Sequence, residues 1–167
     1  TPVDFDELTR LGSMMGSGAM IVMDDSDCVV DVGRYFLRFL EEESCGKCLP
    51  CRLGLTRLRE ILDNFSKGLG SEQDIEDLTS LSKAIQDGAL CALGASAPNP
   101  VLTTIRYFKE EYLAHVNHQK CPAGVCKDLI TFAIDPALCT GCMSCARQCP
   151  AQCITGTKKE PHAIDAE

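Results

Sequence analysis

The chain of 167 residues has no tryptophan and few other aromatic side chains, three tyrosines and six phenylalanines. Any single large core would therefore consist of Leu, Ile, Val, Ala and Met, and several small cores organised around metal fit this composition better. No apolar run approaches the ~20 residues that a membrane-spanning helix needs. The N-terminal segment TPVDFDELTR has neither the basic start nor the apolar stretch of a secretion signal. We expect a cytoplasmic protein without membrane insertion.

Basic side chains are also scarce, because 16 Lys and Arg face 24 Asp and Glu and give a formal net charge of -8. Binding to a phosphate backbone calls for a clustered excess of Lys and Arg. This balance excludes nucleic acid as a partner.

Cysteine, by contrast, is abundant, with twelve residues. Disulfides are a poor explanation, because six of these cysteines lie in two triplets with two residues between neighbours, which are badly placed to join distant loops. The long stretch from Leu53 to Lys120 holds only Cys91 and has the pattern of ordinary helical core. The cysteine spacing therefore indicates metal or cluster binding.

The pattern predicts a mainly α chain with three parts. Residues 1–27 would be the end of an upstream α/β domain, with a short helix, a turn and a strand at Ala19–Met23, so that the chain begins within a domain. Residues 28–118 would form a four-helix bundle that holds a 4Fe-4S cluster. The helices expected from apolar spacing and caps are 29–43, 52–67, one capped by Ser71 that ends before Gly88, and one that opens at Asn99.

Residues 119–167 would form a small α+β ferredoxin-like iron–sulfur domain, cut short at its C-terminal end. Seven of the twelve cysteines fall after Lys120. Alternation of apolar residues predicts a short strand at Ile130–Ile134, and Ile154 is expected on a returning strand.

The first cysteine group lies in ESCGKCLPCRLG, where Cys45, Cys48 and Cys51 have C-x2-C-x2-C spacing and Cys91 follows after two predicted helices. A cubane cluster needs four thiolates, and three on one tight loop with a distant fourth satisfy it. A zinc site with four cysteines would usually show two separated C-x2-C pairs. The spacing therefore favours a cluster on these four residues.

The second group is CTGCMSCARQCP, in which Cys139, Cys142, Cys145 and Cys149 match the C-x2-C-x2-C-x3-C-P run of bacterial ferredoxins. In two-cluster ferredoxins the first three cysteines hold one cluster and the fourth serves the other. We therefore expect the fourth ligand of the Cys139 cluster outside the chain, or alternatively Cys149 or Cys153 closing a single cluster.

Four cysteines lie outside these two groups: Cys28, Cys121, Cys126 and Cys153. Cys28, beside two valines, is predicted to be an inert buried side chain. Cys121, Cys126, Cys153 and His162 together offer three sulfurs and one imidazole, a ligand set that zinc accepts. The hypothesis is a structural zinc on these four residues, with His115 or His118 as substitutes for His162; free thiols or ligands of another cluster are the alternative.

The motif ESCGKCLPCRLG with Cys91, and the preceding segment DELTRLGSMMGSGAMIVMDD, resemble the flavin- and NADH-binding subunit of complex I over roughly residues 1 to 115. The resemblance implies a tetranuclear cluster in a helical bundle, with FMN and NAD(H) bound by an upstream part that this chain lacks. No Gly-rich phosphate loop is present, since the glycines before residue 20 do not form the fingerprint.

The ferredoxin-like extension looks like the beta subunit of electron-bifurcating, NAD-dependent iron–iron hydrogenases. It also resembles some NADP-reducing hydrogenases and NAD-dependent formate dehydrogenases. The resemblance implies a C-terminal portion of an oxidoreductase subunit that relays single electrons, has no catalytic site in this segment, and has other subunits of the complex and ferredoxin as partners. The rival hypotheses are a structural zinc module that joins subunits and an independent ferredoxin.

Overall fold

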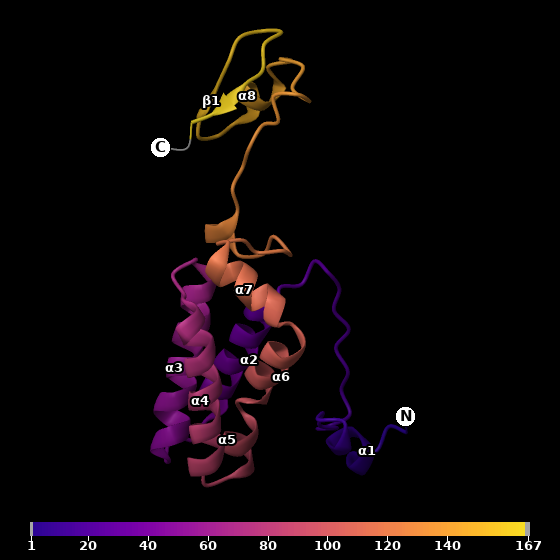
Figure 1. Cartoon of the computed structure of the whole chain (residues 1–167), viewed down its shortest axis with the longest axis vertical. Coiled ribbons are helices and arrows are strands. Elements are labelled where there is room, and N and C mark those ends of the chain that lie inside the picture. Colours follow the sequence, from indigo (N-terminus) through magenta and orange to yellow (C-terminus); the bar gives the residue numbers. More distant parts are fainter. Residues whose placement is uncertain (1, 166–167) are drawn as a thin grey trace.

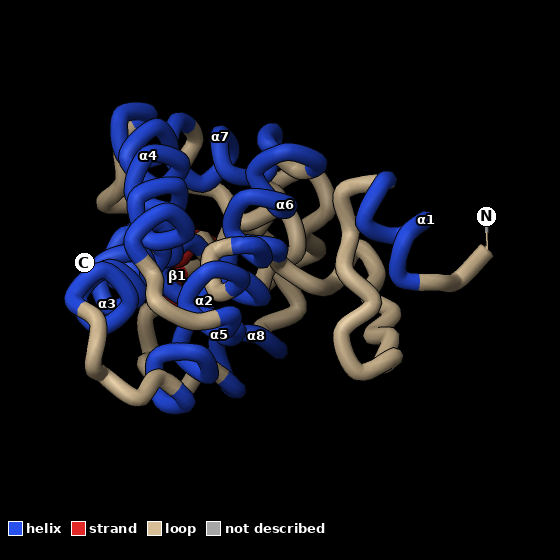
Figure 2. Tube along the Cα trace, turned by 90° about the horizontal axis from the view of Figure 1, so that it is seen from below, coloured by secondary structure: helices blue, strands red, loops and turns tan. Residues whose placement is uncertain are grey.

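The computed structural model describes residues 2–165, and helices dominate it (Figure 1). The elements, in chain order, are α1 Phe5–Arg10, α2 Val29–Glu43, α3 Leu49–Ser66, α4 Glu72–Gly88, α5 Ala92–Ser96, α6 Asn99–Tyr107, α7 Lys109–Asn117, the 3-10 helix η1 Lys127–Leu129, α8 Ser144–Gln148, β1 Ile154–Thr155 and β2 Ala163–Ile164. Helices α2, α3, α4, α6 and α7 pack against one another, and Figure 2 views them nearly end-on. The mainly α fold is therefore as predicted.

The core of the helical part is aliphatic, as the scarcity of aromatic residues requires. Leu37 of α2 and Leu78 and Ile85 of α4 are fully buried. The largest share comes from one face of α3, with Leu55, Leu58, Ile61, Leu62 and Phe65. This face has the 3.6-residue period that the sequence shows, so burial of a single apolar stripe explains why α3 forms where it does.

Local signals set the ends of α3 and α4. Gly68 follows α3 with a φ of 71°, a left-handed conformation that glycine adopts without strain, and it stops the helix. Ser71 then begins α4 through a capping box, in which its backbone N–H donates to the carboxylate of Asp74 at 2.8 Å. Both boundaries agree with the prediction.

The fourth predicted helix is instead two helices. Phe108, with φ -130° and ψ 35°, ends α6 and precedes α7. The break turns Tyr112 into the core, where its ring meets Phe65 edge-on at 6.1 Å and its hydroxyl lies 2.7 Å from the hydroxyl of Thr104. Packing of one large aromatic side chain therefore overrides a continuous apolar period.

Two predicted strands are wrong. Residues 19–23 contain no strand, and Met20 and Val22 are 85 % and 87 % exposed. Ile130–Ile134 is irregular as well. Strands need a partner for their backbone groups, and neither segment has one among residues 2–165. The strand expected at Ile154 is present, because β1 pairs antiparallel with β2, with Ile154 opposite Ile164.

The C-terminal unit, with α8, β1 and β2, lies beyond an extended segment at one end of the helical part (Figure 1). The α1 segment lies to the side of the helices (Figure 2). Among the described residues, no helix combines the length and apolarity needed to cross a membrane. Residues 1, 166 and 167 of the predicted domains lie outside the described part of the chain.

Candidate metal centres

The first centre, site A, comprises Cys45, Cys48, Cys51 and Cys91. Cys48 caps the N-terminus of α3, Cys51 lies in its first turn, and Cys91 caps α5. α3 begins three residues earlier than predicted, with Pro50 in its first turn, a position that proline favours. Helix N-termini present backbone N–H groups and a positive dipole end, and both stabilise thiolates.

The two loops of site A lie against each other. The backbone N–H of Leu90, next to Cys91, donates to the sulfur of Cys48 and lowers the pKa of that thiol. A Cβ placed on Gly94 would lie 3.5 Å from the sulfur of Cys51. The loop that carries Cys91 therefore lies beside the start of α3, and the binding of one cluster by these four cysteines stays a prediction. Cys45 and Cys91 are exposed and Cys51 is buried, so a cluster here would sit at the surface end of α3.

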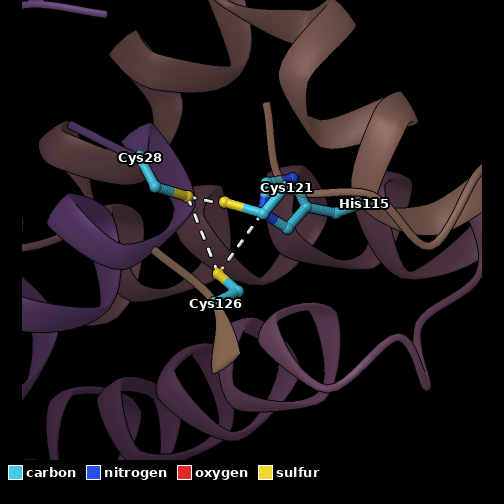
Figure 3. A group of neighbouring side chains, drawn as sticks. All are labelled: Cys28, His115, Cys121 and Cys126. Atoms are coloured by element: carbon cyan, nitrogen blue, oxygen red, sulfur yellow. Dashed lines mark hydrogen bonds between the residues drawn. The ribbon is translucent and has the colours of Figure 1, made fainter. Parts of the chain in front are cut away.

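The second centre, site B, comprises Cys28, His115, Cys121 and Cys126, which Figure 3 shows pointing toward one another. All four residues are buried, and their ligating atoms lie within 4.8 Å of one another. Cys28 precedes α2, His115 lies on α7, and the other two flank the loop that follows. The segment before α2 thus meets α7 and the loop directly after it, although Cys28 and His115 are 87 residues apart in the sequence.

The distances in site B fit a single ion. The sulfur of Cys28 lies 3.8 Å from that of Cys126, and Nε2 of His115 lies 3.3 Å and 3.5 Å from these two sulfurs. The edges of a tetrahedron around zinc are about 3.8 Å between two sulfurs and about 3.6 Å between sulfur and nitrogen. In an iron–sulfur cluster each thiolate binds a different iron, which places the ligands farther apart. Site B therefore has the size of a mononuclear site.

The ring of His115 is oriented for ligation. Its Nδ1 lies 2.7 Å from the backbone carbonyl of Glu111, which can only accept a hydrogen bond. The Nδ1–H therefore donates to this carbonyl, and Nε2 faces the sulfurs, where a metal would take the place of its proton. A histidine that binds a metal through one nitrogen commonly donates through the other in this way.

The electrostatics of site B favour anionic sulfur. The hydrogen bond from Cys126 lowers the pKa of Cys28 to about 4 against an opposing effect of burial, and the same contact raises the pKa of Cys126. Burial lowers the pKa of His115, but hydrogen bonds to the Cys28 thiolate and the Glu111 carbonyl outweigh it and raise that pKa to about 9. A thiolate at neutral pH is the form that binds metal.

Site B differs from the predicted zinc set. Cys121 and Cys126 were expected together with Cys153 and His162, but the structure groups them with Cys28 and with His115, one of the two named substitutes for His162. Cys153 lies 3.6 Å from the sulfur of Cys149, in the C-terminal unit. Chain topology explains the difference, because residues 119–126 fold back onto the start of α2 while the extended segment carries the later residues away. Cys28 is buried, as predicted, but its sulfur faces His115 and Cys126.

The third centre, site C, comprises Cys139, Cys142, Cys145 and Cys149 around α8. Cys145 lies on α8, and the backbone N–H of Ser144 lowers the pKa of Cys142. The backbone N–H of Cys153 is the largest cause of the lowered pKa of Cys149. Cys139 accepts a hydrogen bond from the backbone N–H of His162, at 3.4 Å. Backbone N–H groups thus donate to three of these four sulfurs, and hydrogen bonds to sulfur are one means by which iron–sulfur proteins set their potentials.

Comparison with known proteins assigns these regions. Residues 31–115 match the NADH-ubiquinone oxidoreductase-F iron-sulfur binding region, about half of the chain. The chain belongs to this family. Residues 131–154 match a 4Fe-4S binding domain. The two matched regions contain site A and the cysteines of site C, respectively.

Three relatives show how far the similarity extends. The HndC subunit of the NADP-reducing hydrogenase of Solidesulfovibrio fructosivorans is 55 % identical over 96 % of this chain and 33 % of its own length. An NADH-quinone oxidoreductase subunit of Mycobacterium tuberculosis is 41 % identical over 72 % of this chain and 27 % of its own. A crystal structure of an NAD+-reducing NiFe hydrogenase aligns with 57 % of this chain and 16 % of its own, at 32 % identity and a TM-score of 0.55. The chain thus spans about a third or less of these relatives.

Proposed function

We propose that this chain is the electron-relay segment of a multisubunit, NAD(P)-linked hydrogenase. The observation that carries the proposal is the 55 % identity to a hydrogenase subunit across 96 % of the chain, which includes both the site A region and the ferredoxin-like unit. The similarity to the mycobacterial NADH-quinone oxidoreductase subunit covers only 72 % of the chain. This difference in coverage favours a hydrogenase over a complex I subunit.

The division of the chain follows from the same reasoning. Residues 28–118 would act as a four-helix bundle, with α6 and α7 together as the fourth helix, and residues 119–167 as the ferredoxin-like domain. Residues 1–27 would belong to an upstream domain that binds FMN and NAD(H). This arrangement would place site A between the flavin and site C.

The residues of this chain would ligate and position the clusters. Cys45, Cys48, Cys51 and Cys91 would hold a 4Fe-4S cluster in site A. Cys139, Cys142 and Cys145 would hold a second in site C, with Cys149 assigned to a neighbouring cluster. When bound, the clusters supply one-electron redox chemistry, while the protein sets ligation, burial and hydrogen bonds. No side chain of this segment is required to act as a general acid or base.

Each cluster would have its own electron-transfer partner. Site A would exchange electrons with the flavin, and the site C unit would exchange them with ferredoxin or another subunit, so that the complex bifurcates electrons between NAD(P) and ferredoxin. The extended segment before Cys139, which sets the C-terminal unit apart from the helices, supports a role of that unit in reaching a partner.

The function can be tested on the full-length subunit in its complex. Anaerobic reduction with hydrogen should give EPR signals of 4Fe-4S clusters and reduce NAD(P)+ only when ferredoxin is also present. Cys51→Ser should remove one signal and block electron flow while NADH still bleaches the flavin. Reduction by formate but not hydrogen would instead identify a formate dehydrogenase, and a colourless protein with zinc in every site would identify a structural module.

Site B completes the proposal as a structural zinc centre. The matching distances, the complete burial and the oriented His115 favour one tetrahedral zinc with three sulfurs and one nitrogen. Such an ion would join the start of α2, the end of α7 and the loop at residues 121–126. The ion would stabilise the folded state and would not carry electrons, because zinc is not redox-active.

Metal analysis of matched variants tests site B against the set predicted from sequence. Cys28→Ser and His115→Ala should each lose about one zinc per chain and retain their iron. Cys153→Ser and His162→Ala should keep the zinc. Retention of zinc in the first pair and loss in the second would refute the assignment to site B, and iron in place of zinc in the wild type would refute the choice of metal.

A further inference from the structure

His162 is one of the few buried polar residues, with 3 % of its surface exposed, and site B does not use it. It lies against Cys139 of site C. Its backbone N–H donates to the sulfur of Cys139 at 3.4 Å, and its ring Nδ1 lies 3.9 Å from the same sulfur. A buried imidazole beside a cluster ligand needs an explanation other than the zinc role that the sequence suggested.

Each nitrogen of the His162 ring faces an acceptor, and the neutral imidazole donates to one of the two. Nδ1 lies 3.1 Å from the backbone carbonyl of Glu160, and Nε2 lies 3.1 Å from the sulfur of Met143. Met143 stands between Cys142 and α8 in a left-handed conformation, with a φ of 66°, which a side chain of its size rarely adopts. The ring therefore connects the segment after β1 to the loop that carries the cysteines.

The close approach of these two segments depends on two glycines. A Cβ on Gly141 would lie 2.5 Å from the backbone nitrogen of Glu160, and one on Gly156 would lie 2.8 Å from the ring of His162. The backbone N–H of Lys159 donates to the carbonyl of Gly141 at 3.0 Å. The segment at residues 156–162 is thus seated directly on the cysteine loop, and the backbone N–H of His162 is held at Cys139.

We propose that His162 is a positioning residue that raises the reduction potential of the cluster bound by Cys139. Hydrogen bonds to a cluster sulfur stabilise the more negative, reduced state, and they are one of the means by which a protein sets the potential. The ring acts through its contacts with Glu160 and Met143, which fix the backbone N–H on the sulfur. In this role it acts beside the cluster and does not ligate it.

This inference rests on the proposed function, since it needs a cluster at Cys139. Potentiometric EPR titration of the full-length subunit tests it, with Cys139→Ser to identify the signal of this cluster. His162→Ala removes the ring, and His162→Phe keeps its bulk but removes both nitrogens. The control is His118→Ala, an exposed histidine after α7.

With full iron and sulfide content, both His162 variants should shift this one signal to lower potential. At a fixed ambient potential the ratio of reduced to oxidised cluster should fall about tenfold, equivalent to about 59 mV for one electron. The His118 variant should match the wild type. An unchanged potential in both His162 variants would overturn the inference, as would loss of the cluster in both, because His162 would then serve cluster binding. If Cys139→Ser leaves iron content and signals unchanged, the proposed function itself fails at site C.

Discussion

Gly54 lies in the second turn of α3 at a point where α3 meets α4, and its replacement by alanine should destabilise the protein. A Cβ at this position would lie 2.5 Å and 2.6 Å from Cγ1 and Cδ1 of Ile85, a fully buried side chain. In an open helix the same change would stabilise by about 0.5–1 kcal/mol, because glycine lowers helix stability. Overpacking of a well-filled core costs about 1–3 kcal/mol. We expect Gly54→Ala to lower the free energy of unfolding by about 1–2 kcal/mol.

A matched control is available on α2. A Cβ on Gly33 would lie 3.3 Å from one terminal methyl of Leu62, which can move by a few tenths of an ångström. Gly33→Ala should therefore stay within about 0.5 kcal/mol of the wild type. The assay is urea-induced unfolding followed by far-UV circular dichroism, on proteins of equal metal content.

A double-mutant cycle with Ile85→Ala isolates the proposed contact. That substitution alone should cost about 2–5 kcal/mol through the cavity that it leaves. In Gly54→Ala/Ile85→Ala the new methyl occupies part of this space, so the double variant should be more stable than the sum of the single effects by about 1 kcal/mol or more. Strict additivity, or a Gly54→Ala protein as stable as the wild type, would refute the packing argument.

Three further predictions concern local interactions. Ser71→Ala removes the capping box of α4 and should cost about 1 kcal/mol of unfolding free energy, whereas Ser71→Thr, which keeps the hydroxyl, should largely restore it; equal stability of all three proteins would contradict the cap. Tyr112→Phe removes the hydroxyl contact to Thr104 and should cost about 0.5–1.5 kcal/mol in the same assay, with no change expected if the hydroxyl is not bonded. Burial acts to raise the pKa of Glu41, but hydrogen bonds from a threonine hydroxyl and from Arg59 hold it below the usual value. The stabilisation is therefore present above the unfolded-state pKa and lost as pH falls through the folded-state pKa, so that Glu41→Gln should destabilise at pH 7 and have little effect in acid; a constant difference between pH 7 and acid would refute this sign.

The helices of the bundle region could be predicted because their determinants are local. The apolar stripe of α3, Gly68 after it and Ser71 before α4 all act within a few residues of the boundaries that they set. The break at Phe108 was not predictable in this way. It depends on where Tyr112 finds space beside Phe65, and that contact forms only once the helices have packed.

The two strand predictions were wrong because a strand depends on non-local contacts. Alternating or apolar residues at 19–23 and 130–134 satisfy the sequence pattern of a strand, but a strand also requires a neighbour that no local pattern encodes. The strand at Ile154 could be predicted because its partner, Ile164, lies only ten residues later in the sequence.

Site A was predicted as a group because a triplet in one loop already fixes three of its members. Site B has no such triplet. Cys28 and Cys126 are 98 residues apart in the sequence, and His115 is one of three histidines without a distinguishing neighbour. The one local signal was the place of Cys28 immediately before a predicted helix, where a thiolate gains from the helix N-terminus.

The position of site B also explains why a metal would be useful there. In residues 119–126, which leave the helical part, the only buried side chains are Cys121 and Cys126 themselves. Ala123 is the one partly buried apolar side chain of this loop that packs against the core, so the loop has little apolar contact besides its cysteines. A metal that joins it to Cys28 closes a long loop and removes much of the conformational freedom of the unfolded chain, which stabilises the folded state. The ion would thus hold residues 119–126 in place at the start of the extended segment that leads to site C. The stability of this junction would depend on metal binding more than on burial of apolar side chains.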